Sequence, residues 1–183
     1  MAPDFEYFFK MSVSSRVSHT FAGLFYFDLP ATMLLGMVFH SLVKRALIVN
    51  FPSFIQIRLH QLKAFDFISY LKKSPLVFTY SALLGGVTHI AWDSFTHADG
   101  FFVTRLPALY QDAFVPFDGV HYPLWYGLQH ISTWVGLTIL VVYFFTQKPQ
   151  PGTVHQPTFA YWTAVLILCV GVVGLRFGFS FDH

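Results

Sequence analysis

Charged residues are scarce in this chain. Asp, Glu, Lys and Arg together make up 11% of its 183 residues, whereas soluble domains carry about 25%. Hydrophobic residues make up 55%, and the mean hydropathy is +0.54. A soluble domain with so few charges would be unusual, so the composition indicates an integral membrane protein.

Cysteine and net charge are low as well. The single cysteine, Cys169, excludes a disulfide within the chain and a zinc site built from several cysteines. A net charge of +2, with no dense Lys/Arg run in a known nucleic-acid motif, argues against nucleic acid as a partner. The chain opens on Met1-Ala-Pro-Asp, without the basic segment and apolar core of a signal peptide. We therefore expect internal segments to direct membrane insertion.

The sequence does contain long apolar runs. Four of them reach the roughly 20 residues that a helix needs to cross the hydrocarbon core of a bilayer. They cover residues 21–42, 76–95, 126–145 and 159–177. Asp28 and Pro30 predict a kink in the first run, because proline interrupts helical hydrogen bonding. The sequence predicts an all-α fold, a polytopic transmembrane helical bundle of about four spans in a single domain over residues 1–183.

The connection after the first run mixes apolar and basic residues over 54–73. This pattern favours an amphipathic helix in the membrane interface, with its basic side toward anionic headgroups. A surface helix packed on the bundle is an equal alternative. Six basic residues lie in the connection 43–75 and only Arg105 in 97–125, which predicts that the first connection is cytoplasmic. Lys10 and Arg16 weakly disagree with this orientation.

Polar residues cluster near the end of the second run, in T-H-I-A-W-D-S-F-T-H. His89, Asp93 and His97 are spaced by four, which places them on one face of a helix. Ionisable residues within a membrane segment are candidates for a functional site. Imidazole nitrogens and carboxylate oxygens are metal ligands, so this column predicts a metal site.

Further candidates fall on the same side of the membrane under the predicted topology. They are Asp4 and Glu6 before the first span, His19 at its mouth, and His130 near the outer end of the third. Hydrolytic metal centres combine such ligands with an open coordination position for water. Asp4, His19 and His130 could complete one or two such sites together with His89 and Asp93. Glu6 could serve as general base for the metal-bound water, and His130 could instead act as general acid.

Structural explanations compete with this hypothesis. His89 and Asp93 could form an intramembrane hydrogen bond that holds two helices together, and His97 could be a helix-end residue. A non-enzymatic scaffold or assembly subunit with a structural polar cluster is therefore an alternative. A haem protein with His89 and His130 as axial ligands is another, although Asp93 has no evident role beside a haem.

Several motifs together resemble a known family. They are A-P-D-F-E-Y-F at the start, S-H-T before G-L-F-Y-F-D-L-P, the T-H-I-A-W-D-S-F-T-H run, and L-Q-H-I-S-T-W-V-G. In combination they resemble the bacterial integral-membrane family called domain of unknown function 4184. That family is more distantly similar to inner-membrane proteins described as membrane-bound metal-dependent hydrolases.

The resemblance implies that Asp4, His19, His89 and Asp93 match metal-ligand positions and that His130 matches a further recurrent histidine. It also implies a bacterial inner membrane as the location. Relatives begin with an upstream apolar segment bearing a Ser-His pair, so we expect this chain to be shortened at its N-terminus. The combined prediction is a metal-dependent hydrolase with an outward-facing His/Asp site. Its metal would be zinc, with manganese as the alternative, and its substrate an ester or phosphoester, with a lipid suggested by location alone.

Overall fold

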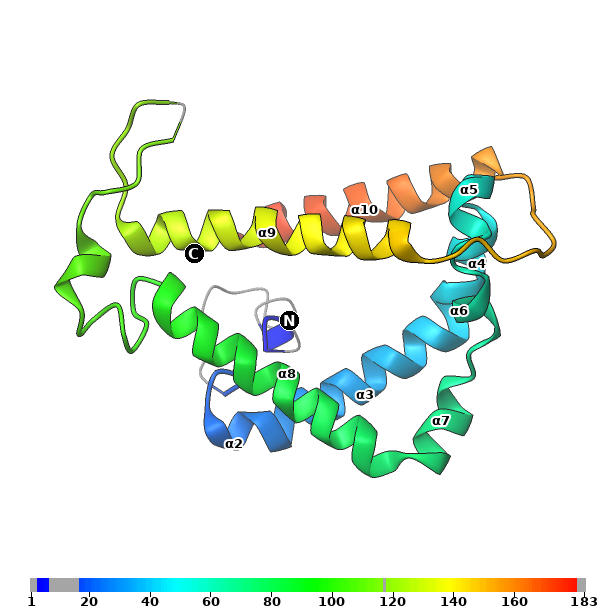
Figure 1. Ribbon diagram of the computed structural model, residues 1–183, viewed down its shortest axis with the longest axis horizontal. Helices are drawn as coiled ribbons and strands as arrows, with labels where there is room; N and C mark the ends of the chain where they lie inside the picture. The colour runs from blue at the N-terminus through cyan, green and yellow to red at the C-terminus, as the bar shows by residue number, and fades with distance from the viewer. Residues whose placement is uncertain (1–2, 7–16, 117, 181–183) are drawn as a thin grey trace. The chain divides into compact units, whose positions relative to one another are not determined.

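The structure is a computed structural model that describes residues 3–6, 17–116 and 118–180. All of the regular secondary structure assigned among these residues is helical (Figure 1). Lys10 and Arg16, which entered the prediction of orientation, lie outside these residues. The chain forms two units, Met1–Leu83 with Lys148–His183, and Leu84–Gln147. The prediction of an all-α fold is confirmed.

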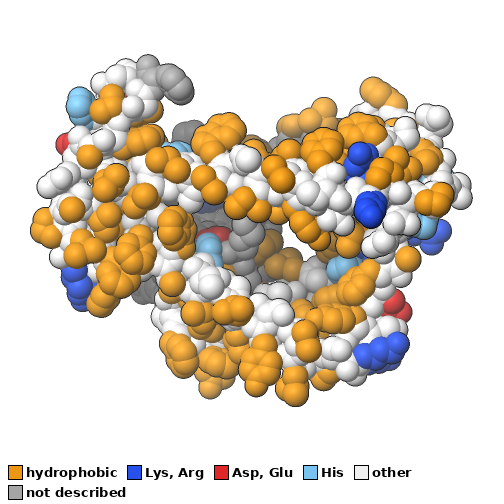
Figure 2. Space-filling view, viewed as in Figure 1, with side chains coloured by type: hydrophobic (Ala, Val, Ile, Leu, Met, Phe, Trp, Pro, Cys, Tyr) orange, Lys and Arg blue, Asp and Glu red, His pale blue; other side chains and the backbone are white. Residues whose placement is uncertain are grey.

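Three helical stretches are long and apolar enough to cross a membrane. They are Phe21–Val49, the helix α9 (Leu124–Thr146) and most of α10 (Phe159–Ser180), with mean hydropathies of 1.5, 1.5 and 1.9. Hydrophobic side chains cover much of the visible surface in Figure 2. Trp134 on α9 and Ile167 on α10, for example, are 69% and 66% exposed. Helices with such surfaces need an apolar solvent, as in an integral membrane protein.

The run expected as the second span is also a helix, α8 (Pro75–Thr96), of 22 residues. It is long enough to cross a membrane but is not among the helices apolar enough to do so. Thr88, His89, Asp93 and Ser94 lie in its last three turns, and these polar groups lower its hydropathy. The residues proposed to carry the chemistry are thus the ones that weaken α8 as a span.

The first span departs from α-helical hydrogen bonding where Asp28 and Pro30 predict a kink. The Leu29 N–H donates to the Leu24 carbonyl, five residues back instead of four, which makes a π-helical turn. Pro30 has no N–H to donate and its ring crowds the preceding turn, so a wider turn accommodates it. The span consists of α2 (Phe21–Gly23), the π-turn Leu24–Asp28, α3 (Leu29–Val38), the π-turn Phe39–Val43 and α4 (Lys44–Val49).

The segment expected as one interfacial helix over 54–73 is divided between three short helices. They are α5 (Ser53–Gln56), α6 (His60–Ala64) and α7 (Phe67–Lys73). Asp66 caps α7, since its carboxylate accepts hydrogen bonds from the Ser69 N–H (3.1 Å) and hydroxyl (2.7 Å). Phe65 is extended, and the buried Lys44 ammonium donates to its carbonyl. Capping and this ammonium stabilise the break between α6 and α7.

Two buried amides join α4 and α5 to the segment that leads into α10. Asn50 Oδ1 accepts hydrogen bonds from the Thr158 N–H (2.9 Å) and hydroxyl (2.7 Å). The Gln56 side chain bonds both backbone groups of His155, at 2.6 and 3.0 Å. Trp162 on α10 donates its indole N–H to the Asn50 carbonyl at 2.9 Å. Contacts about 100 residues apart in sequence therefore fix the start of α10 within the first unit.

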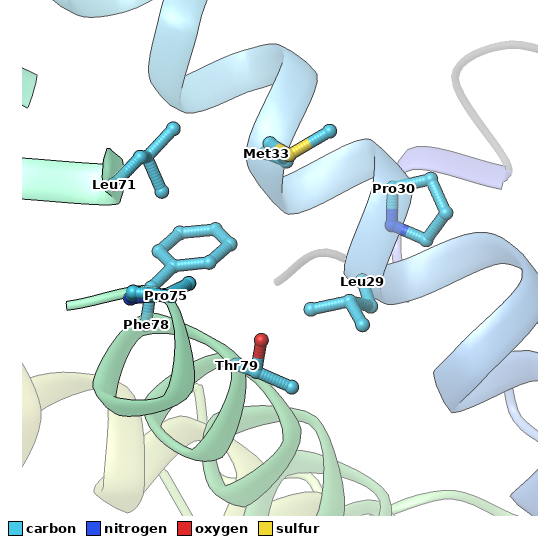
Figure 3. Close-up of a pocket in the computed structure, with 7 residues that line it drawn as sticks. All are labelled: Leu29, Pro30, Met33, Leu71, Pro75, Phe78 and Thr79. Atoms are coloured by element: carbon cyan, nitrogen blue, oxygen red, sulfur yellow. The ribbon is translucent and has the colours of Figure 1, made fainter. Parts of the chain in front are cut away.

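An apolar cavity of about 290 Å³ lies in the first unit among α3, α7 and the first turns of α8 (Figure 3). It is lined by Leu29, Pro30, Met33, Leu71, Pro75, Phe78 and Thr79. Phe67 closes the packing beside it: its ring stands edge-on to Phe78 at 5.8 Å and fills the space above Gly36. Among the described residues, the lining contains no His, Cys or carboxylate, so it offers none of the ligands of the candidate metal centre.

In the second unit, the connection after α8 folds back onto the start of α9. The Leu124 N–H donates to the Gln111 carbonyl at 3.0 Å. Phe114 lies so close to Gly127 that an added Cβ would stand 2.5 Å from its Cγ. Glycine at this position lets the aromatic ring approach the α9 backbone.

Candidate metal centre

The three polar residues at the end of α8 meet on one face, as their spacing predicts. His89 Nε2 lies 3.2 Å from Asp93 Oδ2, and His97 Nδ1 lies 3.7 Å from Asp93 Oδ1. The Asp93 side chain is 13% exposed, His89 21% and His97 45%. The carboxylate is therefore the centre of the column, with one imidazole above it and one below.

A tight turn fixes the end of α8 that carries Asp93. The Ser94 carbonyl accepts hydrogen bonds from the N–H groups of Phe102 (3.0 Å) and Val103 (3.3 Å), and Val103 is fully buried. Gly100 makes the turn possible, because an added Cβ would lie 2.6 Å from the Ser94 oxygen and 2.9 Å from the Asp93 oxygen. The backbone next to Asp93 is thus held by residues 100–103 as well as by the helix itself.

In the first unit, a buried carboxylate clamps the segment that precedes His19. Pro3 to Glu6 forms a turn in which the Glu6 N–H donates to the Pro3 carbonyl. Glu6 is 1% exposed, and its Oε2 accepts hydrogen bonds from the N–H groups of Val17 (3.1 Å) and Ser18 (2.7 Å). Asp4 is exposed in the same turn. The clamp therefore ties the turn that carries Asp4 to the residues next to His19.

The S-H-T motif and the glycine after it have separate roles in orienting His19. The hydroxyl of the buried Ser18 lies 3.1 Å from His19 Nδ1. Thr20 caps the following helix by accepting a hydrogen bond from the Gly23 N–H. An added Cβ at Gly23 would lie 1.9 Å from the Val17 carbonyl oxygen, so only glycine fits there. A hydrogen bond at Nδ1 fixes the imidazole ring, as is common for metal-binding histidines.

We call Asp4, His19, His89 and Asp93 the His/Asp set; each carries a group that could bind a metal ion, and two of them lie in each unit. Within the first unit, a carboxylate oxygen of Asp4 and a ring nitrogen of His19 lie within 4.8 Å of one another. Within the second unit, His89 and Asp93 form the pair at 3.2 Å. Two imidazole nitrogens and two carboxylate oxygens suit zinc or manganese, so the donor chemistry fits the expected metal.

The remaining predicted site residues lie outside this set. His130 is exposed on α9, with its ring edge-on to Tyr126 at a centroid distance of 4.3 Å. Glu6 uses Oε2 to hold backbone N–H groups. The catalytic roles assigned to both residues stay predictions. The sequence analysis did not identify Glu6 as a clamp or Ser18 as the partner of His19, although the adjacency of Ser and His offered a signal for the second.

A comparison with known protein families identifies the family of this sequence. Residues 1–181 match the family described as Domain of unknown function (DUF4184). The chain belongs to the DUF4184 family. The resemblance predicted from the motifs is thereby confirmed, while the more distant similarity to metal-dependent hydrolases rests on the motifs alone. Comparison with curated proteins and with solved structures finds no match.

Proposed function

We propose that this DUF4184 protein is a membrane-embedded, metal-dependent hydrolase that acts on an ester or phosphoester. The observation that carries the proposal is the pre-orientation of both ligand pairs. His19 is held at Nδ1 by Ser18, and Asp93 lies on a helix end locked by the Gly100 turn. Residues that hold ligands in place are typical of metal sites.

The chain supplies four protein ligands in this proposal. They would be Asp4 and His19 in the first unit and His89 and Asp93 in the second. When bound, a divalent ion would act as a Lewis acid and would lower the pKa of a bound water molecule toward neutral. For catalysis, an ion held by these residues would need a coordination position left open for water or substrate. Zinc is the proposed metal, and manganese is the alternative.

A lipid is the proposed substrate class because of where the ligands lie. His89 and Asp93 occupy the last turns of α8, where this otherwise apolar helix becomes polar. A site at such a position meets the ester and phosphate groups of lipids before any soluble molecule. Glu6 remains the proposed general base and His130 the proposed general acid.

Metal content of the purified chain tests the site. We would measure metals by mass spectrometry in detergent-purified wild type and in the variants His89→Ala/Asp93→Ala and His19→Ala. His155→Ala is the matched control, because its exposed side chain is outside the set and its described hydrogen bonds are made by the backbone. The proposal predicts a stoichiometric metal that either site variant abolishes and the control retains.

The possible results of this experiment distinguish three hypotheses. Loss of only part of the metal in each site variant would mean that the two pairs bind separate ions. No metal in any folded sample would favour a structural polar cluster in a scaffold protein. Where metal is present, the absence of hydrolysis of chromogenic esters, phosphodiesters and phospholipids would overturn the hydrolase while leaving the metal site intact.

A further inference from the structure

A second cavity in the first unit is lined by basic side chains. It has a volume of about 280 Å³ and is lined by Arg45, His60, Lys63 and Ala64. Arg45 belongs to α4, and the other three belong to α6. None of these residues belongs to the His/Asp set, so the cavity is independent of the proposed function.

The lining carries positive charge without compensation. Arg45 and Lys63 are permanently charged near neutral pH, and no carboxylate is among the described residues that line the cavity. Within the part of the chain that the structure describes, neither side chain forms an ion pair or a hydrogen bond. Two cations that line one cavity repel each other, so an anion between them would be stabilised by both. The planar guanidinium of arginine can bind two phosphate oxygens at once.

Residues that are distant in the sequence hold the wall of the cavity in place. The His60 ring lies against Gly152, where an added Cβ would stand 2.4 Å from His60 Cδ2. The Gln150 N–H donates to the Ile57 carbonyl at 2.9 Å, which ties this segment to the start of α6. The imidazole is therefore held in place by packing, and the cavity does not depend on a freely moving side chain.

The position of Arg45 near the end of the first span indicates which anion the cavity would meet. It is four residues before the end of the first span, Phe21–Val49, which is about 6 Å along a helix. The stretch has 29 residues and is about 44 Å long, against about 30 Å of hydrocarbon, so its ends extend to the headgroups. Basic groups at this depth attract anionic lipids. We propose that this cavity binds a phosphate group, supplied by the headgroup of an anionic phospholipid, with Arg45 and Lys63 as its ligands.

The test uses the full chain in a nonionic detergent. It is titrated separately with dioctanoyl phosphatidylglycerol, with zwitterionic dioctanoyl phosphatidylcholine and with inorganic phosphate, and binding is followed by native mass spectrometry. The site variant is Arg45→Gln/Lys63→Gln. The matched control is Lys72→Gln/Lys73→Gln, which removes the same charge from exposed positions on α7 outside the cavity. Circular dichroism verifies that each variant is folded.

We expect phosphatidylglycerol to bind more tightly than phosphatidylcholine. The site variant should weaken its binding roughly thirtyfold, given the contribution of two cations near a membrane surface, and the control should change it far less. Inorganic phosphate that binds and is lost in the same variant would support the site with free phosphate as the source. Equal losses in the two variants, or no binding of phosphatidylglycerol and phosphate by wild type, would overturn the proposal.

Discussion

The Glu6 clamp can be tested by comparing two substitutions at the same position. Glu6→Ala removes the acceptor of the Val17 and Ser18 N–H groups, and the Ser18 N–H is left in a buried environment. A buried donor without an acceptor costs about 1–3 kcal/mol. Ser18 is fully buried, whereas Val17 is exposed and water can reach it. We therefore expect a loss of about 3 kcal/mol in the free energy of unfolding.

Glu6→Gln keeps the shape and an oxygen that can accept both hydrogen bonds. It loses only the gain of a charged over a neutral acceptor, about 1 kcal/mol. A chain of this size loses about 2–4 °C in Tm per kcal/mol. Thermal unfolding in detergent should therefore show Tm falling by about 6–12 °C in Glu6→Ala and by a third of that in Glu6→Gln.

The two substitutions also distinguish the clamp from the proposed general base. A base role predicts that Glu6→Gln abolishes hydrolysis while metal content stays near wild type and Tm falls only by this small amount. A clamp role alone predicts that Glu6→Gln keeps activity and that Glu6→Ala loses metal together with stability. An unchanged Tm in Glu6→Ala would refute the reasoning, because it would mean that the two N–H groups find other acceptors at no cost.

Two further predictions concern the ends of helices. Gly100→Ala forces a Cβ against three carbonyl oxygens at the end of α8 and should destabilise the protein by about 1–3 kcal/mol. The control is Gly85→Ala on α8, where an added Cβ meets nothing within 4 Å. Equal Tm values for the two variants would contradict the tight turn. Hydrogen bonds from Ser69 lower the pKa of Asp66, so the stabilisation from this cap is complete above the ordinary Asp pKa of about 3.9 and fades as pH falls below it. The difference in Tm between wild type and Asp66→Ala should shrink correspondingly in unfolding scans at decreasing pH, and a constant difference would contradict the cap.

The fold class followed from the sequence because bilayers constrain sequences strongly. Backbone groups in hydrocarbon must be satisfied within a helix, so runs of about 20 apolar residues identify the spans. The stretches expected at 126–145 and 159–177 match α9 (Leu124–Thr146) and α10 (Phe159–Ser180) closely. The division of 54–73 into three helices was not predicted, because it depends on Lys44 reaching the carbonyl of Phe65, 21 residues away.

The candidate ligands could also be predicted from the sequence. Ionisable residues are rare in apolar segments and therefore stand out, and the spacing of His89, Asp93 and His97 alone places them on one helical face. Helical periodicity is a local property, so no tertiary information was needed. The pair at 3.2 Å between His89 and Asp93 is the direct result of that spacing.

Tertiary structure decided which side chains hold these ligands in place and where further chemistry lies. The contact of Glu6 with Ser18 spans 12 residues, and that of Gln56 with His155 spans 99. No periodicity encodes such pairings, because they depend on how the chain returns to itself. The sequence by itself therefore determined a helical membrane protein and its candidate metal ligands, whereas only the folded chain created the Glu6 clamp, the Gly100 turn and the basic cavity.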